Sequence, residues 1–180
     1  LRRPTTQLPQ LSTQAPAPHA MHDRWRISHA QGYLALGMVD EAAAELAQLP
    51  KTNDSTPVLA LRGLVLQEQR QWPLLLPIAA ELARRDPAEA GWWVMWAYAA
   101  RRSETLAHAE AILRDAELHH PADPTIQFNL GCYACQRGDQ HEAARRVNQA
   151  IALDATFRQQ ALEDDDLAPL RASGYRPPAT

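Results

Sequence analysis

Residues 129–154 read NLGCYACQRGDQHEAARRVNQAIALD, and the spacing of their small residues recurs towards the N-terminus. Four small residues, each within an apolar stretch, follow one another at intervals of 33, 34 and 34 residues: Ala30, Gly63, Ala97 and Gly131. Further sets keep the same register: Ala42, Leu75, Ala109 and Ala143; Leu46, Ala79, Leu113 and Val147. Self-similarity at a period of this length indicates an array of stacked supersecondary units.

Within this register the apolar residues follow a helical period, so each unit is predicted to be a pair of helices. We expect helices near residues 22–36, 39–48, 57–69, 74–85, 89–102, 105–118, 124–137, 140–152 and 157–163. Gly37 and Gly138 suit helix ends, and Pro73 suits a first turn. Pro77 does not suit a helix interior, so the helix at 74–85 is expected to be irregular at its start.

The fourth unit carries the clearest motif: Asn129-Leu130-Gly131, Gly138-Asp139, Glu142-Ala143 and the run AIALD at 150–154. This pattern resembles the tetratricopeptide repeat, a helix–turn–helix unit of 34 residues. The resemblance covers residues 22–157 and implies an all-α, right-handed solenoid of antiparallel helix pairs. The repeats are placed at about 23–55, 56–89, 90–123 and 124–157. The second is degenerate, with Arg62 where leucine is usual and Leu75 where alanine is usual.

The segments outside the array differ from it in composition. Residues 1–21 include Pro4, Pro9, Pro16 and Pro18, and cannot build a core of their own. They are predicted to form either a flexible arm or an extended arm that lies in a groove of this protein or of a neighbouring copy. A solenoid needs a polar cap over its last apolar face, so residues 158–172 are predicted to cap the fourth repeat and 173–180 to form a loose tail.

Composition restricts the partners and the compartment. The formal net charge of −3 argues against a nucleic-acid surface, and no apolar run approaches the length of a membrane span. Two cysteines exclude a disulfide scaffold, and arginine-rich composition with one lysine suggests GC-rich, bacterial coding. We expect a cytoplasmic protein. The chain begins at Leu1 rather than at methionine, which leaves a removed signal segment and the periplasm as the alternative.

Three groups of residues could carry chemistry, and each has a simpler interpretation. Cys132 and Cys135 lie in mid-helix without the further ligands that zinc needs. His119-His120 follow a helix end, where cations complement the dipole. The acidic run 164–166 suits a solvated turn. The sequence contains no phosphate loop or catalytic triad motif, so we expect neither an enzyme, nor a cofactor, nor a metal site.

The resemblance implies that the first helices of successive repeats line a concave groove. The residues expected there are Gln31, Leu61, Leu64, Val94, Met95, Tyr98, Arg101, Arg102, Phe128, Asn129 and Cys132. The clamp of lysine, arginine and asparagine with which some repeats of this kind bind acidic chaperone tails is absent, because the corresponding positions include Ile27, Leu61 and Met95. The predicted groove is apolar and has an arginine pair at one side.

We therefore expect a protein-interaction module that binds an extended or helical apolar segment of a protein or peptide, as an adaptor, assembly factor or chaperone. The ligand would also carry a carboxylate that contacts Arg101 or Arg102. The alternative is a scaffold that self-associates into homo-oligomers through the N-terminal arm. A third reading is the interaction part of a larger enzyme or regulator.

Overall fold

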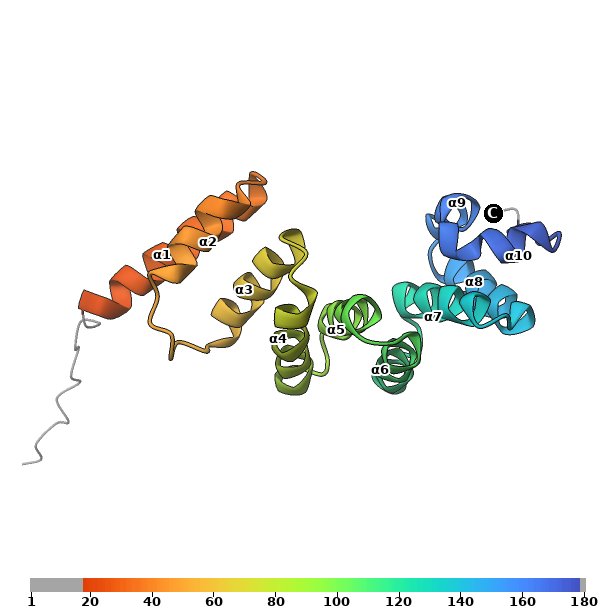
Figure 1. Ribbon diagram of the computed structural model, residues 1–180, viewed down its shortest axis with the longest axis horizontal. Coiled ribbons are helices and arrows are strands. Elements are labelled where there is room, and N and C mark those ends of the chain that lie inside the picture. Colours follow the sequence, from red (N-terminus) through yellow and green to blue (C-terminus); the bar gives the residue numbers. More distant parts are fainter. Residues whose placement is uncertain (1–17, 179–180) are drawn as a thin grey trace, which may run out of the picture. The chain divides into compact units, whose positions relative to one another are not determined.

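The computed structural model describes the backbone of residues 18–178 and the side chains of residues 21–178, and its regular elements within these ranges are all helices. They are α1 (Pro18–Ala35), α2 (Val39–Ala47), α3 (Thr56–Glu68), α4 (Trp72–Arg85), α5 (Ala90–Ser103), α6 (Leu106–His119), α7 (Pro124–Gln136), α8 (Gln140–Leu153), α9 (Phe157–Glu163), the 3-10 helix η1 (Asp165–Leu167) and α10 (Ala168–Ala172) (Figure 1). The predicted all-α class is confirmed, and the nine predicted helices agree with α1 to α9 to within a few residues.

The first unit, residues 1–50, is described as the helix pair α1 and α2. Gly37 ends α1 with a φ of 72°, and Met38 N donates to Tyr33 O at 2.9 Å, which is the hydrogen-bond pattern of a glycine helix end. Ala30 and Ala42 are fully buried where the helices meet. Helix α1 begins at Pro18 rather than near residue 22, with proline in its first turn. Most of the predicted arm therefore lies outside the described residues.

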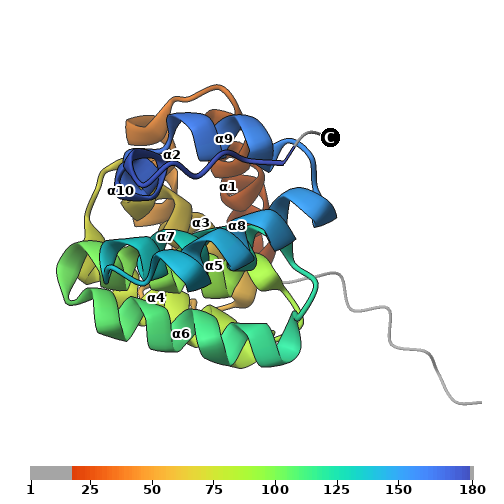
Figure 2. The same cartoon turned by 90° about the vertical axis from the view of Figure 1, so that its right-hand side faces the viewer.

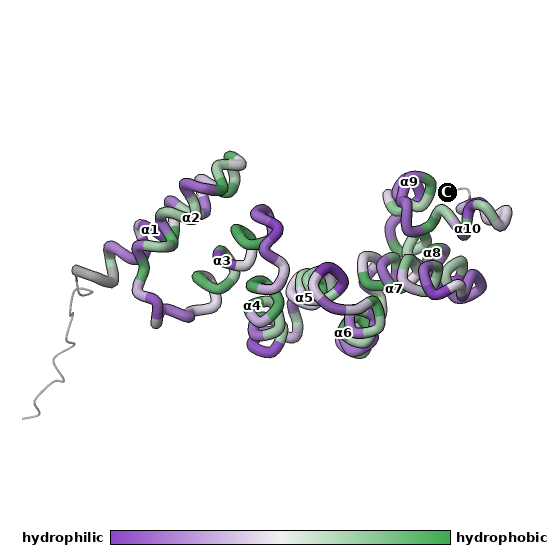
Figure 3. Tube along the Cα trace, viewed as in Figure 1, coloured by the Kyte–Doolittle hydropathy of each residue, from purple (hydrophilic) through white to green (hydrophobic). Residues whose placement is uncertain are grey.

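The second unit, residues 51–180, contains α3 to α10 (Figure 2). Hydrophilic and hydrophobic residues alternate along its helices, as expected of helices that bury one face (Figure 3). Gly131 explains how closely α7 and α8 approach, because a Cβ atom there would lie 2.9 Å from Val147 Cγ2 and 3.4 Å from Ala143 O. The repeat register, which pairs Gly131 with Ala143, thus corresponds to a real helix contact.

Helix α4 differs from the prediction. It runs without interruption from Trp72 to Arg85, although Pro77 lies inside it. The ring of Pro77 is on the exposed side, and the carbonyl that loses its partner belongs to Pro73 in the first turn, where water can replace the bond. The expected irregularity at the start of this helix is therefore wrong.

The C-terminal segment packs on α7 and α8 (Figure 2). Leu167 and Leu170 are buried, and the ring of Phe157 lies 5.0 Å from that of Phe128. Residues 173–178 also contact the unit: Tyr175 donates its hydroxyl proton to Asn148 at 2.7 Å. The segment predicted as a loose tail is thus held against the array as far as it is described.

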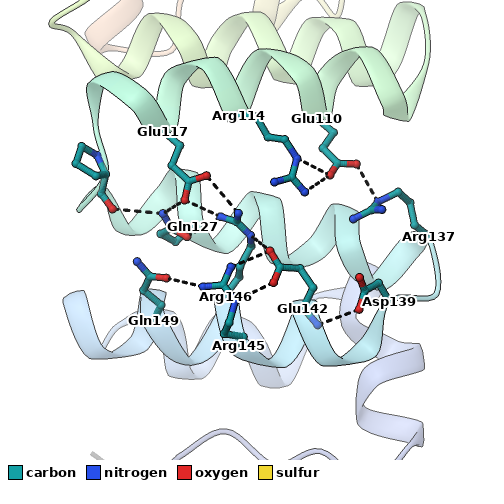
Figure 4. A network of polar contacts seen from close by, with 11 residues as sticks. Glu110, Arg114, Glu117, Gln127, Arg137, Asp139, Glu142, Arg145, Arg146 and Gln149 are labelled. Carbon is teal, nitrogen blue, oxygen red and sulfur yellow. Dashed lines mark hydrogen bonds and ion pairs between the residues drawn. The ribbon is translucent and has the colours of Figure 1, made fainter.

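A polar network joins α6, α7 and α8 (Figure 4). Arg146, whose side chain is only 5% exposed, contacts Glu117 at 2.9 Å and donates to Gln127 Oε1 at 2.8 Å. Gln127 is fully buried and donates in turn to Glu117. Gln127 and Arg146 are buried polar residues, and both have partners, so the network fixes how the fourth helix pair sits on the third.

Candidate partner-binding groove

An open cavity of about 440 Å³ lies against α3, α5 and the start of α7. Its lining is mostly apolar and consists of Leu64, Gln67, Ala90, Gly91, Trp92, Val94, Met95, Tyr98, Asp123 and Thr125. The first helices of the second, third and fourth predicted repeats thus supply this surface. The cavity lies within one unit of the structure.

The helical period places these side chains together. Val94 and Tyr98 are one helical turn apart on α5, as are Leu64 and Gln67 on α3. Met95 is 8% exposed and forms part of the floor, whereas Leu64 and Tyr98 are 38% and 39% exposed at the rim. Gly63 makes room for this floor, because a Cβ atom there would lie 3.3 Å from Met95 Sδ.

A second, more polar cavity of about 620 Å³ adjoins the first and shares Gln67 and Tyr98 with it. Its other lining residues are Glu68, Arg70, Trp72 and Arg102. The Arg102 guanidinium carbon lies 4.0 Å from the centre of the Tyr98 ring and 5.3 Å from that of Trp72. Arg102 Nη2 also donates a hydrogen bond to the Tyr98 hydroxyl.

Five of the residues expected in the groove border these cavities. Leu64, Val94, Met95 and Tyr98 line the apolar cavity, and Arg102 lines the polar one, also beside Tyr98. Gln31 is exposed on α1 of the first unit.

The other expected residues are placed differently. Leu61, Phe128 and Cys132 are buried and line neither cavity. Asn129 donates its amide to Thr125 O at 2.9 Å within α7. Arg101 is half-buried, and its Nε has no hydrogen-bond partner among the described residues.

The C-terminal cap explains why α7 contributes little to the surface. Phe128 packs against Phe157, and Gln136 donates its amide to Asp166 O at 2.7 Å. Cys132 and Cys135 are buried near the same segment. The face of α7 that was expected to border a groove is therefore covered by the chain itself, and only its first turn reaches the cavity.

Nine of the fourteen lining residues stand outside the expected set, and three of these nine, Arg70, Trp72 and Asp123, lie beyond the first helices. Trp72 opens α4, and Arg70 occupies the turn before it with a φ of 56°. Asp123 borders the apolar cavity because it caps α7: its carboxylate accepts a hydrogen bond from Ile126 N at 2.9 Å.

The residues weighed for chemistry have structural roles. Burial raises the pKa of both cysteine thiols, which disfavours the reactive thiolate. His119 stacks on Trp93 at 5.4 Å, and His120 Nε2 lies 2.8 Å from Pro87 O. Among residues 21–178, no group of three or more His, Cys, Asp or Glu side chains is placed to hold a metal ion. No helix in the described part of the chain is long and apolar enough to cross a membrane.

Comparison with known proteins finds matches among solved structures. No protein-family model matches the chain, and no curated protein matches it. TTC0263, a thermophilic TPR protein in Thermus thermophilus, is 21% identical with a TM-score of 0.64, over 86% of this chain and 84% of that one.

Two further solved structures agree. YrrB, described as a TPR protein with an unusual peptide-binding site, is 15% identical with a TM-score of 0.64, over 85% of this chain and 75% of that one. The MamA RS-1 ArsTM double mutant is 18% identical with a TM-score of 0.66, over 79% and 78% of the two chains. The repeat register, the helix pairs and these likenesses together show that the chain has the helical-repeat fold of tetratricopeptide repeat proteins.

Proposed function

We propose that the chain is a protein-interaction module that binds a short apolar segment of a protein partner in the cavity between α3, α5 and α7. The observation that carries the proposal is the lining of this cavity. Leu64, Val94, Met95 and Tyr98 present mostly apolar atoms around an open volume of about 440 Å³. An open cavity of this volume with a mostly apolar lining and a few polar groups has the usual form of a ligand-binding pocket.

The side chains around the cavity suit a ligand with one inserted apolar side chain. Met95 provides a polarisable, adaptable floor, and Tyr98 a broad aromatic wall with a polar edge. The fold supports this use, because helical-repeat arrays bind partners on extended surfaces formed by successive units. The YrrB structure, whose description names a peptide-binding site, is consistent with a peptide ligand here.

Selection of peptides on the full chain tests this proposal. The probe is a display library of random 12-residue peptides, with Leu64→Gln as the test variant. Leu64 is 38% exposed, so a ligand can bury only that part of its side chain, which is worth about 1 kcal/mol, or roughly fivefold in affinity. We expect the selected peptides to contain apolar residues and to lose affinity for Leu64→Gln by that amount.

Leu118→Gln is the matched control, because Leu118 is 81% exposed on α6 and lines neither cavity. It should bind the selected peptides as the unaltered chain does. If both variants bind equally well, or if the library yields no binding peptide, the groove assignment is refuted.

A specific observation favours self-association as a second candidate function. Met21 and Trp25 lie one turn apart on α1 and are 63% and 57% exposed, and Leu36 at the end of the helix is 75% exposed. A second copy could cover this apolar surface. Light scattering should then report an oligomer that becomes a monomer in Trp25→Ser. If the unaltered chain and Trp25→Ser are both monomers, the self-associating scaffold is contradicted.

A further inference from the structure

We propose that the polar cavity beside Arg102 is a carboxylate subsite, which binds an Asp or Glu side chain of the partner segment whose apolar side chain enters the neighbouring cavity. This inference rests on the function proposed above and specifies the chemistry of the ligand. The two cavities share Gln67 and Tyr98, so a single short segment can contact both.

Arg102 is held in place before any ligand arrives. Its guanidinium lies over the Tyr98 ring at 4.0 Å and near the Trp72 ring at 5.3 Å, while Nη2 donates to the Tyr98 hydroxyl. The two rings meet edge to face, with centres 5.3 Å apart. Arginine carries five N–H donors in a planar fork, so several remain for a carboxylate. A fixed fork loses less conformational entropy on binding than a mobile one.

The positive charges of the two arginines that line the polar cavity, Arg70 and Arg102, are not neutralised by ion pairs with residues of the cavity. Within the described part of the chain, neither Arg70 nor Arg102 forms an ion pair with an acidic side chain. Glu68 also lines the cavity but makes no ion pair with either of them in the described structure. Two arginines thus face one glutamate, and this excess of positive charge favours an acidic ligand.

The chain's own N-terminal arm is a poor occupant for this subsite. Residues 1–20 contain no Asp or Glu, and their charged residues are Arg2 and Arg3. An arm of this composition would add positive charge beside Arg70 and Arg102. An acidic segment of a partner protein would instead complement this charge.

The competing interpretation assigns Arg102 a local role. A cation in the last turn of α5 complements the helix dipole, and its stacking would simply cover Trp72. That role predicts a change in stability without any preference among ligands. The experiment therefore compares ligands that differ only in charge.

Two peptide libraries test the subsite on the full chain. Both contain random 12-residue peptides with amidated C-termini. One allows Asp and Glu, and in the other Asn and Gln replace them. We expect the acidic library to give binders about tenfold tighter than the neutral one, as for a hydrogen-bonded charge pair. Arg102→Gln should remove this difference, and Arg102→Lys should restore part of it, because lysine keeps the charge without the planar fork.

Arg84→Gln is the matched control, since Arg84 is exposed on α4 and outside both groove cavities. It should leave the preference intact, and thermal unfolding should show that Arg102→Gln is folded. A preference that persists in Arg102→Gln overturns the subsite, as does binding that needs a free C-terminus instead of Asp or Glu. Equal binding of both libraries also overturns the subsite, but it does not contradict the apolar groove. Peptides that bind Leu64→Gln as tightly as the unaltered chain would refute the groove itself.

Discussion

Replacing Arg146 by methionine should destabilise the array far more than the same change at Arg145. The two arginines are neighbours on α8, and both bind Glu142, so they form a matched pair (Figure 4). They differ in burial: the side chain of Arg146 is 5% exposed and that of Arg145 is 50% exposed. Methionine is unbranched, like the aliphatic part of arginine, and it removes the charge at either site.

The magnitude follows from the groups that Arg146→Met leaves behind. Gln127 is fully buried, and its Oε1 loses the hydrogen bond from Arg146, which costs about 1–3 kcal/mol. Glu117 loses contacts at 2.9 and 3.2 Å and keeps only the Gln127 amide. Breaking a buried ion pair by removing one partner typically costs about 3–5 kcal/mol, and we expect a loss in this range. Arg145→Met should cost less than about 1 kcal/mol, as an exposed pair does.

Urea unfolding followed by circular dichroism measures both changes in one series. The midpoint should fall strongly for Arg146→Met and hardly move for Arg145→Met. If the two single variants unfold at the same urea concentration, the network does not stabilise the array, and the reasoning from burial fails.

Three further outcomes follow from the structure. Gly131→Ala should lower the free energy of unfolding by about 1–2 kcal/mol in the same assay, because its Cβ would lie 2.9 Å from Val147, an overpacking cost that exceeds the gain in helix propensity. Hydrogen bonds and charge from Arg145 and Arg146 lower the pKa of Glu142 to about 2. This carboxylate therefore stabilises the fold above its ordinary pKa of 4.5, and the effect is lost as pH falls towards 2, so Glu142→Gln should make acid unfolding less dependent on pH in that window. Cys132 should resist iodoacetamide at pH 8 until urea unfolds the chain, because burial raises its pKa; rapid labelling of the native protein would contradict this.

The sequence predicted the helices well because the signal for them is local and repeated. Small residues at a fixed period can be read without a structure, and Gly131 lies against Ala143 as the register requires. Helix ends were equally readable at Gly37 and Gly138, where positive φ angles of 72° and 85° favour glycine. The fold of the array therefore follows from residues that act within one repeat or between neighbours.

The candidate binding surface was less predictable because it depends on contacts between residues far apart in the chain. The register places Phe128 and Cys132 on the groove side of α7 but cannot show that Phe157 and the following helices cover them. Arg101 and Arg102 are adjacent and chemically alike in the sequence. Only the side-chain positions distinguish Arg102, which lies over Tyr98 and Trp72, from half-buried Arg101.

Coverage of α7 by the C-terminal segment also limits the length of the ligand that we propose. The apolar cavity spans α3, α5 and the first turn of α7, and the polar cavity continues along α3 and α5 to the start of α4. Packed helices lie about 8–10 Å apart, so the open surface extends roughly 20 Å across. An extended chain covers about 3.3 Å per residue and would cross this surface in about six residues. A ligand of this size has room for an apolar side chain beside Met95 and an acidic one beside Arg102, whereas a long amphipathic helix would extend beyond the surface that the cap leaves open.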